Sequence, residues 1–218
     1  GCRCRDITVV CTDMTVYQPL VNLVFHRLHI PVYQSGTEDI LQKSVIATVL
    51  MALDAALSGF DQKSVLRYLR SALSPVDPDT CDRIENYAII WGIRGQKWTQ
   101  SWENHPDGLS GVWTEEDQHR LEELNTAREL AIAPLTRLWQ GFRDASDLRG
   151  QILALYGFLE DISLEMRLSR MAQELDAAGD NRAAQILNQL WEILLGALEQ
   201  MYDMLGDTHW EGEQFIRL

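Results

Sequence analysis

The stretch from residue 78 to residue 98 constrains the fold of this chain more than any other. Apolar residues recur there at helical spacing, so they predict one buried face of a helix that begins near Pro78: Ile84, Tyr87, Ala88 and Trp91. Gly92 can take the left-handed backbone conformation that closes a helix. Arg94 and Trp98 follow on a second short helix. The chain is therefore expected to make a fixed corner inside a helical domain.

The chain opens with an alternation of strand and helix signals. Residues 6–11 are β-branched and apolar, which is typical of a strand covered on both faces. An apolar helical stripe runs from residue 17 to residue 28, and residues 31–33 read as a second short strand. Two such parallel strands need neighbours that complete their hydrogen bonds and cover their faces. Residues 1–36 are therefore predicted to be a βαβ piece of a larger sheet, in a chain excised from a longer protein.

Helix signals dominate the rest of the chain. Residues 38–57 read as a long core helix, Asp61 and Asp77 as helix caps, and Pro134 as a residue that kinks or interrupts a long helix. We therefore predict a mainly α fold, in which residues 37–218 form a multi-helix domain behind the small βαβ piece.

The charge balance limits how the chain can meet nucleic acid. Its 32 acidic and 19 basic residues give a formal net charge of −13, which repels a phosphate backbone at long range. Strong non-specific binding by the whole surface is therefore not expected, whereas a local basic patch is compatible with this charge.

The apolar runs and the cysteines bear on cellular location. The longest apolar run, from Val45 to Leu57, contains Asp54 and is shorter than the ~20 residues that a membrane span needs. The cysteines lack the spacing of a zinc site and are expected to be free thiols: Cys2, Cys4, Cys11 and Cys81. We expect a soluble cytoplasmic protein with no membrane partner.

Motifs for catalysis and cofactor binding are missing from the sequence. It contains no phosphate-binding Gly-x-x-x-x-Gly-Lys loop, no Gly-x-Ser-x-Gly elbow and no His-Glu-x-x-His. His26 and His29 lie one helical turn apart without evident further ligands, and the acidic residues 115–117 are explained by the first turn of a helix. We expect no catalytic, cofactor-binding or metal site, and no enzymatic activity of this segment alone.

Two groups of cations are candidates for contact with DNA. Lys63, Arg67 and Arg70 fall at i, i+4 and i+7, a stripe suited to a DNA backbone, and Arg94 presents a cation at the corner. The alternative for the stripe is a solvated face paired with carboxylates, and for Arg94 an internal contact with helix-end carbonyls or a carboxylate. The tryptophans are expected to pack in the core rather than to stack on bases: Trp91, Trp98, Trp102, Trp139 and Trp191.

Two separated regions, with weaker similarity between and beyond them, carry a resemblance to a known family. The first comprises residues 5–10 with the positions that follow it: Asp13, Tyr17, Val24, Phe25, Ile30 and Pro31. The second is Glu-Asn-Tyr and Gly-Ile-Arg-Gly within residues 85–98, and the pattern continues through Asn125 to Arg128 and residues 154–160. This ordered series resembles the B subunit of AddAB-type (RexAB-like) ATP-dependent helicase–nucleases, with the first region at motif IV of superfamily 1 helicases.

The resemblance implies a place and a role in a larger protein. Residues 1–36 would belong to the second RecA-like motor domain, and residues 37–218 would be the helical subdomain inserted at its 2B position. The segment would be a non-catalytic part that helps to hold the DNA path of an enzyme that processes double-strand DNA breaks for recombinational repair. Its implied partners are an AddA-type subunit and double-stranded DNA ends.

The resemblance also implies where the cofactors of the parent complex lie. ATP and Mg would be bound outside this segment, as would the iron–sulfur cluster, so no cysteine of this chain is assigned to the cluster. Thr12 occupies the position of the motif IV arginine, and a threonine supplies no charge to a nucleotide phosphate. The alternative function is a free-standing acidic helical domain that binds a basic protein partner and has no DNA role.

Overall fold

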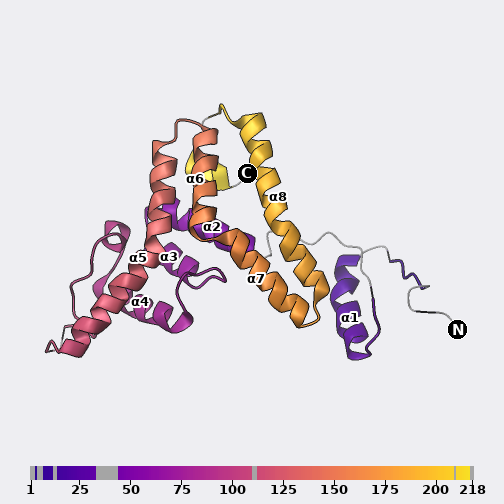
Figure 1. Cartoon of the computed structure of the whole chain (residues 1–218), viewed down its shortest axis with the longest axis horizontal. Coiled ribbons are helices and arrows are strands. Elements are labelled where there is room, and N and C mark those ends of the chain that lie inside the picture. The colour runs from indigo at the N-terminus through magenta and orange to yellow at the C-terminus, as the bar shows by residue number, and fades with distance from the viewer. Residues whose placement is uncertain are drawn as a thin grey trace. The chain divides into compact units, whose positions relative to one another are not determined.

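A computed structural model of the chain describes residues 3, 7–11, 14–32, 44–109, 112–208 and 210–216 (Figure 1). It divides the chain into two compact units, Gly1–Ile40 and Leu41–Leu218, each of which is described by itself. The domain boundary expected between residues 36 and 37 lies outside the described residues.

The first unit holds one described helix, α1 (Met14–Arg27). His29 closes it with a left-handed φ of 53°, and the next N–H, that of Ile30, donates to the carbonyl of Phe25 at 2.8 Å. The helix expected in the opening segment is therefore present.

The two strands expected on either side of α1 are not seen in the described residues. Residues 7–11 and 30–32 have no strand structure. Val9 and Val10 are uncovered as well, at 73% and 87% exposed. A strand needs a neighbour for its backbone N–H and C=O groups, and the described residues of this unit contain no other strand that could supply one. The βαβ piece is thus not shown, and the larger sheet stays a prediction.

All secondary-structure elements in the described part of the second unit are helices. They are α2 (Ser44–Leu57), α3 (Gln62–Leu69), α4 (Pro78–Trp91), the 3₁₀ helix η3 (Gly95–Trp98), α5 (Glu115–Asp144), α6 (Leu148–Asp161), α7 (Leu164–Ala177), α8 (Asn181–Leu205) and α9 (Gly212–Ile216). The mainly α fold class is confirmed.

The helix ends around the predicted corner form as the sequence indicates. Asp61 caps α3 by accepting hydrogen bonds from the next turn, and Asp77 caps α4 ahead of Pro78. Gly92 takes φ 56° and ψ 50°, and the N–H of Ile93 folds back to a carbonyl of α4 at 2.9 Å. These local signals therefore fix both ends of α4.

Pro134 does not interrupt α5, contrary to one of the two outcomes expected. The helix continues from Glu115 to Asp144, and Pro134 lies on its buried face. The carbonyl that loses its helical partner belongs to Leu130, whose side chain is 57% exposed. Burial of the apolar face of α5 offsets the missing hydrogen bond.

Packing in the second unit proceeds by helix pairs. α5 lies against α6 and α7 against α8, while α2 contacts α3, α5 and α9 (Figure 1). The largest fully buried side chains, Trp98, Tyr68 and Tyr87, are at most 1% exposed. Among the described residues, no helix is long and apolar enough to cross a membrane.

Candidate nucleic-acid interface

Two turns meet at the corner that the sequence predicts. The turn between α2 and α3 contains Phe60, whose carbonyl accepts a hydrogen bond from the N–H of Gly95 at 2.9 Å. The side-chain amide of Gln62 donates to the Ala88 carbonyl at 2.7 Å. Gly95 has a φ of 58°, a conformation that favours glycine. The start of α3 and the end of α4 are therefore held at fixed positions.

Arg67 and Arg70 of the predicted stripe are engaged by carboxylates. Arg67 lies 3.5 Å from Asp54 on α2. Arg70 lies 3.0 Å from Asp82 and also bonds to Glu85, both on α4, and its hydrogen bond with Glu85 raises its pKa. This pairing is that of the solvated face considered as the alternative. DNA contact by these two arginines stays a prediction.

Lys63 and Arg94 differ from those two arginines. Both side chains are exposed, and neither forms an ion pair with another described residue. Arg94 makes no contact with the carbonyl at the end of α4; the Gly92 carbonyl instead accepts a hydrogen bond from Lys97 at 3.5 Å. Lys63 lies in the first turn of α3 and Arg94 precedes η3, so the two flank the corner. Of the four cations predicted as DNA contacts, Lys63 and Arg94 are therefore the two that form no ion pair with a described carboxylate.

The aromatic residues beside Arg94 form a core rather than a stacking platform. Tyr87 stacks on Trp102 with ring centroids 4.4 Å apart, and Trp98 lies 5.8 Å from Trp102. Trp98 and Trp102 are 0% and 4% exposed, so no base can reach their faces. The expected core role of these two tryptophans is confirmed.

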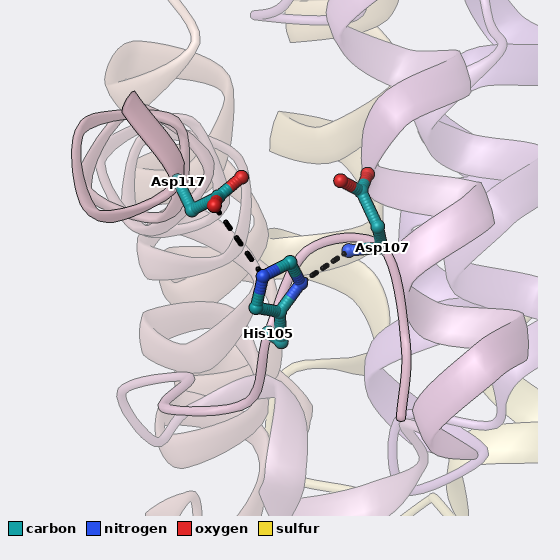
Figure 2. Close-up of side chains that lie close together, drawn as sticks. All are labelled: His105, Asp107 and Asp117. Carbon is teal, nitrogen blue, oxygen red and sulfur yellow. Dashed lines mark hydrogen bonds and ion pairs between the residues drawn. The ribbon is translucent and has the colours of Figure 1, made fainter. Parts of the chain in front are cut away.

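A histidine and two aspartates come together where the loop before α5 meets that helix (Figure 2). His105 is buried, and its Nδ1 accepts a hydrogen bond from the backbone N–H of Asp107 at 3.1 Å. The ring proton therefore stands on Nε2, which faces Asp117 Oδ2 at 3.4 Å. His105 is not among the residues predicted from the sequence.

The hydrogen bonds of this cluster do not fit a metal site. A metal on Nε2 would shift the ring proton to Nδ1, where it would face the N–H of Asp107, and Arg120 already bonds to the carboxylates of both Asp107 and Asp117. Hydrogen bonds from Thr114 and then from Arg120 lower the pKa of Asp117 to about 2. Asp117 also completes the capping box of α5 with Thr114. The cluster fastens the loop to the helix.

The remaining residues considered in the sequence analysis are two histidines, the cysteines and Thr12. His26 and His29 are exposed, and Cys81 is a buried thiol. Cys2, Cys4 and Thr12 lie outside the part of the chain that the structure describes.

Arg128 is a buried cation for which no contact was predicted from the sequence. It is 7% exposed, donates from Nη1 to the Trp98 carbonyl at 2.9 Å and from Nε to Asn125 at 3.3 Å. Its guanidinium also lies 5.9 Å from the centre of the Trp102 ring. Burial lowers its pKa more than the negative charge of Glu129 raises it, and no described carboxylate forms an ion pair with it.

A signal for this position exists in the sequence. Arg128 stands at helical spacing between Leu124 and Ile132, which are 5% and 2% exposed. An arginine inside an apolar helical stripe is expected to be buried, and a buried arginine either has an ionic or hydrogen-bonding partner or binds a ligand.

The comparisons with known proteins point to one kind of protein. No protein-family model matches the chain. The B subunit of the ATP-dependent helicase/deoxyribonuclease from Geobacillus kaustophilus (strain HTA426) is 31% identical over 231 residues. Proteins of the same name are 32% identical over 219 residues in Geobacillus thermodenitrificans and 26% identical over 220 residues in Clostridium botulinum (strain Hall).

These alignments cover nearly all of the chain and a small part of each relative. The three alignments include 100%, 94% and 100% of the chain, but only 20%, 19% and 19% of the relatives. The chain thus spans about a fifth of the length of the curated relatives that it matches. The resemblance to a segment of a larger B subunit is confirmed.

Proposed function

The chain is homologous over its length to one segment of the B subunit of ATP-dependent helicase/deoxyribonucleases, and from that premise we propose that it is a non-catalytic structural segment of such a protein. It helps to hold the DNA path of a helicase–exonuclease that processes double-strand DNA breaks for recombinational repair. The observation that carries this proposal is the similarity of 26–32% identity along the whole chain.

The corner in the second unit supports a positioning role. Its backbone is fixed by the hydrogen bonds of Phe60 and Gln62, so cations mounted on it keep their places. Lys63 and Arg94 are exposed there and free of carboxylates among the described residues. Fixed cations that touch phosphates position a strand without reading its sequence.

The exposed apolar side chains of the first unit support a place inside a larger protein. Leu20, Leu23 and Leu28 are 56%, 68% and 61% exposed. Several exposed leucines on or just after one helix are typical of a surface that packs against another part of a protein, which agrees with residues 1–36 as a βαβ piece of a motor domain whose other strands lie elsewhere in the parent. Residues 37–218 are then the inserted 2B-type subdomain.

The partners and cofactors of the parent follow from the same proposal. The segment works beside an AddA-type subunit on double-stranded DNA ends, in the cytoplasm. ATP and Mg act in the parent complex at sites outside this chain, and the iron–sulfur cluster is held elsewhere. The segment by itself is predicted to be inactive.

The test is an internal deletion in the assembled enzyme. Residues 41–218, the second compact unit, are replaced by a short flexible linker in the full B subunit, and assembly with the A subunit is checked by size-exclusion chromatography. We expect a complex that still hydrolyses ATP but unwinds and degrades forked duplex DNA poorly. Normal DNA processing by the assembled complex would refute the positioning role.

The corner cations provide a finer test in the same complex. Lys63→Gln together with Arg94→Gln should weaken DNA binding and lower the salt dependence of binding by about one to two released counterions. Arg67→Gln with Arg70→Gln is the comparison pair, and a smaller loss is expected from it because those arginines already form ion pairs with carboxylates. Equal losses from both pairs would show that only net charge matters. If the chain acts instead as a free-standing acidic interaction domain, neither pair alters DNA binding.

A further inference from the structure

Arg128 is a buried cation without an ion pair in a chain rich in acidic residues. The chain has 32 acidic residues, and exposed arginines such as Arg83 and Arg137 form ion pairs with carboxylates at 3.2 Å and 2.6 Å. Arg128 is more deeply buried than either, forms no ion pair with a described carboxylate, and is acted on only by the more distant charge of Glu129. A buried cation that is only partly compensated is costly, so an anion that reaches it is bound with advantage.

The donors of Arg128 are only partly used. A guanidinium has five N–H groups, and here Nη1 and Nε make one hydrogen bond each, to the Trp98 carbonyl and to Asn125. Nη2 makes no hydrogen bond with the described residues. These two contacts and the Trp102 ring fix the guanidinium plane, so the remaining N–H groups are held in place rather than mobile.

A pocket of about 290 Å³ opens beside this guanidinium. Its lining comes from the end of η3 and from one face of α5: Thr99, Arg128, Glu129, Ile132, Ala133, Thr136 and Arg137. Arg137 adds a second guanidinium, of which Nε is bound to Asp161 while the terminal nitrogens make no hydrogen bond with described residues. Two arginines, one buried and one exposed, therefore line one opening.

We propose that the pocket lined by Arg128 and Arg137 takes a backbone phosphate of DNA. This inference rests on the proposed function and gives the DNA path a specific contact. The fork of the Arg128 guanidinium matches the oxygens of a phosphate, and Arg137 adds a second positive charge to the lining of the same pocket. The hydroxyl protons of Thr99 and Thr136 are already given to backbone carbonyls, so the arginines are the donors.

Glu129 makes the proposal sharply testable. It is exposed, lines the same pocket, and forms no ion pair with either arginine. A carboxylate at the rim repels a phosphate that enters. Glu129→Gln therefore strengthens DNA binding if a phosphate sits here, by about two- to threefold at low salt. Glu129 is on the surface, so the substitution does not endanger folding.

The experiment measures binding of labelled forked duplex DNA to the 218-residue chain across a salt series. Arg137→Gln should weaken binding by about two- to threefold and lower the salt slope by less than about one, because Arg137 is already paired with Asp161. Arg128→Lys keeps the charge but loses the fork, and it should also weaken binding, with tryptophan fluorescence used to verify the fold. The matched controls are Glu199→Gln for Glu129 and Arg170→Gln for Arg137, both exposed residues of other helices.

The outcomes separate this proposal from the proposed function. Tighter binding by Glu129→Gln, with weaker binding by Arg137→Gln, supports the phosphate pocket. Pocket variants that behave like their controls while the chain still binds DNA overturn the pocket and leave the proposed function standing. If DNA is not bound but a glutamate-rich peptide is, and more tightly by Glu129→Gln, the occupant is a carboxylate of a protein and the phosphate proposal is overturned. No binding of either probe also overturns it, and the proposed function is then judged by the deletion in the assembled enzyme.

Discussion

The two units of this chain contain the same kinds of apolar side chains and bury them to opposite extents. Val9 and Val10 in the first unit are 73% and 87% exposed, whereas Val45 and Val49 in the second are 1% and 4% exposed. The second unit carries within its own sequence the helices that cover α2, namely α3, α5 and α9. The difference indicates that an apolar pattern leads to a buried face only when the elements that pack against that face belong to the same chain.

The two units also end comparable helices with different residues. α4 closes at Gly92 with a φ of 56°, where glycine carries little strain. α1 closes at His29 with a φ of 53°, where a Cβ is disfavoured. The second unit thus has a relaxed helix end and the first a strained one.

The largest expected effect lies in the core of the second unit. Leu69 is 1% exposed, so Leu69→Ala should lower the free energy of unfolding by about 2–5 kcal/mol. Urea unfolding followed by tryptophan fluorescence measures this, because all 7 tryptophans lie in the second unit. Leu130→Ala, at 57% exposed, is the control and should change little. A loss below about 1 kcal/mol for Leu69→Ala would mean that the second unit lacks a packed core.

A smaller effect is expected at the helix ends. Gly92→Ala should cost about 1–2 kcal/mol, and since a Cβ there meets no atom within 4 Å, the cost is backbone strain alone. His29→Gly is the opposite exchange in the first unit, and it should leave the unfolding of the second unit unchanged. A neutral Gly92→Ala would contradict the left-handed closure of α4.

A response to acid is expected in the second unit. The folded pKa of Asp117, about 2, lies below its ordinary value of 3.8, so its contribution to stability is complete above pH 3.8 and is lost as the pH falls towards 2. Asp117→Asn should remove part of the loss of stability between about pH 5 and pH 2, as measured by urea midpoints at each pH. Glu116→Gln, exposed at the same end of α5, is the control, and an equal change there would contradict the assignment.

Whether a feature of this structure can be predicted from the sequence depends on how far apart in the sequence its interacting residues lie. Asp61, Asp77 and Gly92 act within one helical turn, and their roles are visible in the sequence. Arg70 finds its carboxylates 12 and 15 residues away, and Arg128 lies under a carbonyl 30 residues away. Such partners depend on how helices pack, which periodicity does not specify.

The strands expected around α1 mark a different limit. Their local pattern is strong, yet residues 7–11 form no strand in the described structure. Strand formation is not a local property, because the hydrogen bonds of a strand go to its neighbours. The apolar pattern of residues 7–11 therefore predicts a strand only if a neighbouring strand is available, and the βαβ piece stays a prediction.

The smallest effect on stability is expected on α1, and it tests most directly why the two units differ in burial. Leu23 on α1 is 68% exposed, so Leu23→Ala in the 218-residue chain should change the free energy of unfolding of the second unit by less than about 0.5 kcal/mol. If α1 covers a sheet in the full B subunit, the same substitution there should cost as much as a core leucine, about 2–5 kcal/mol, and lower the melting temperature of the motor domain. Because the same substitution is made in both proteins, the difference between the two losses of stability reports only on whether Leu23 is covered. No loss in either context would mean that α1 faces solvent in the parent as well, and the comparison between the units would then reflect their sequences rather than a missing cover.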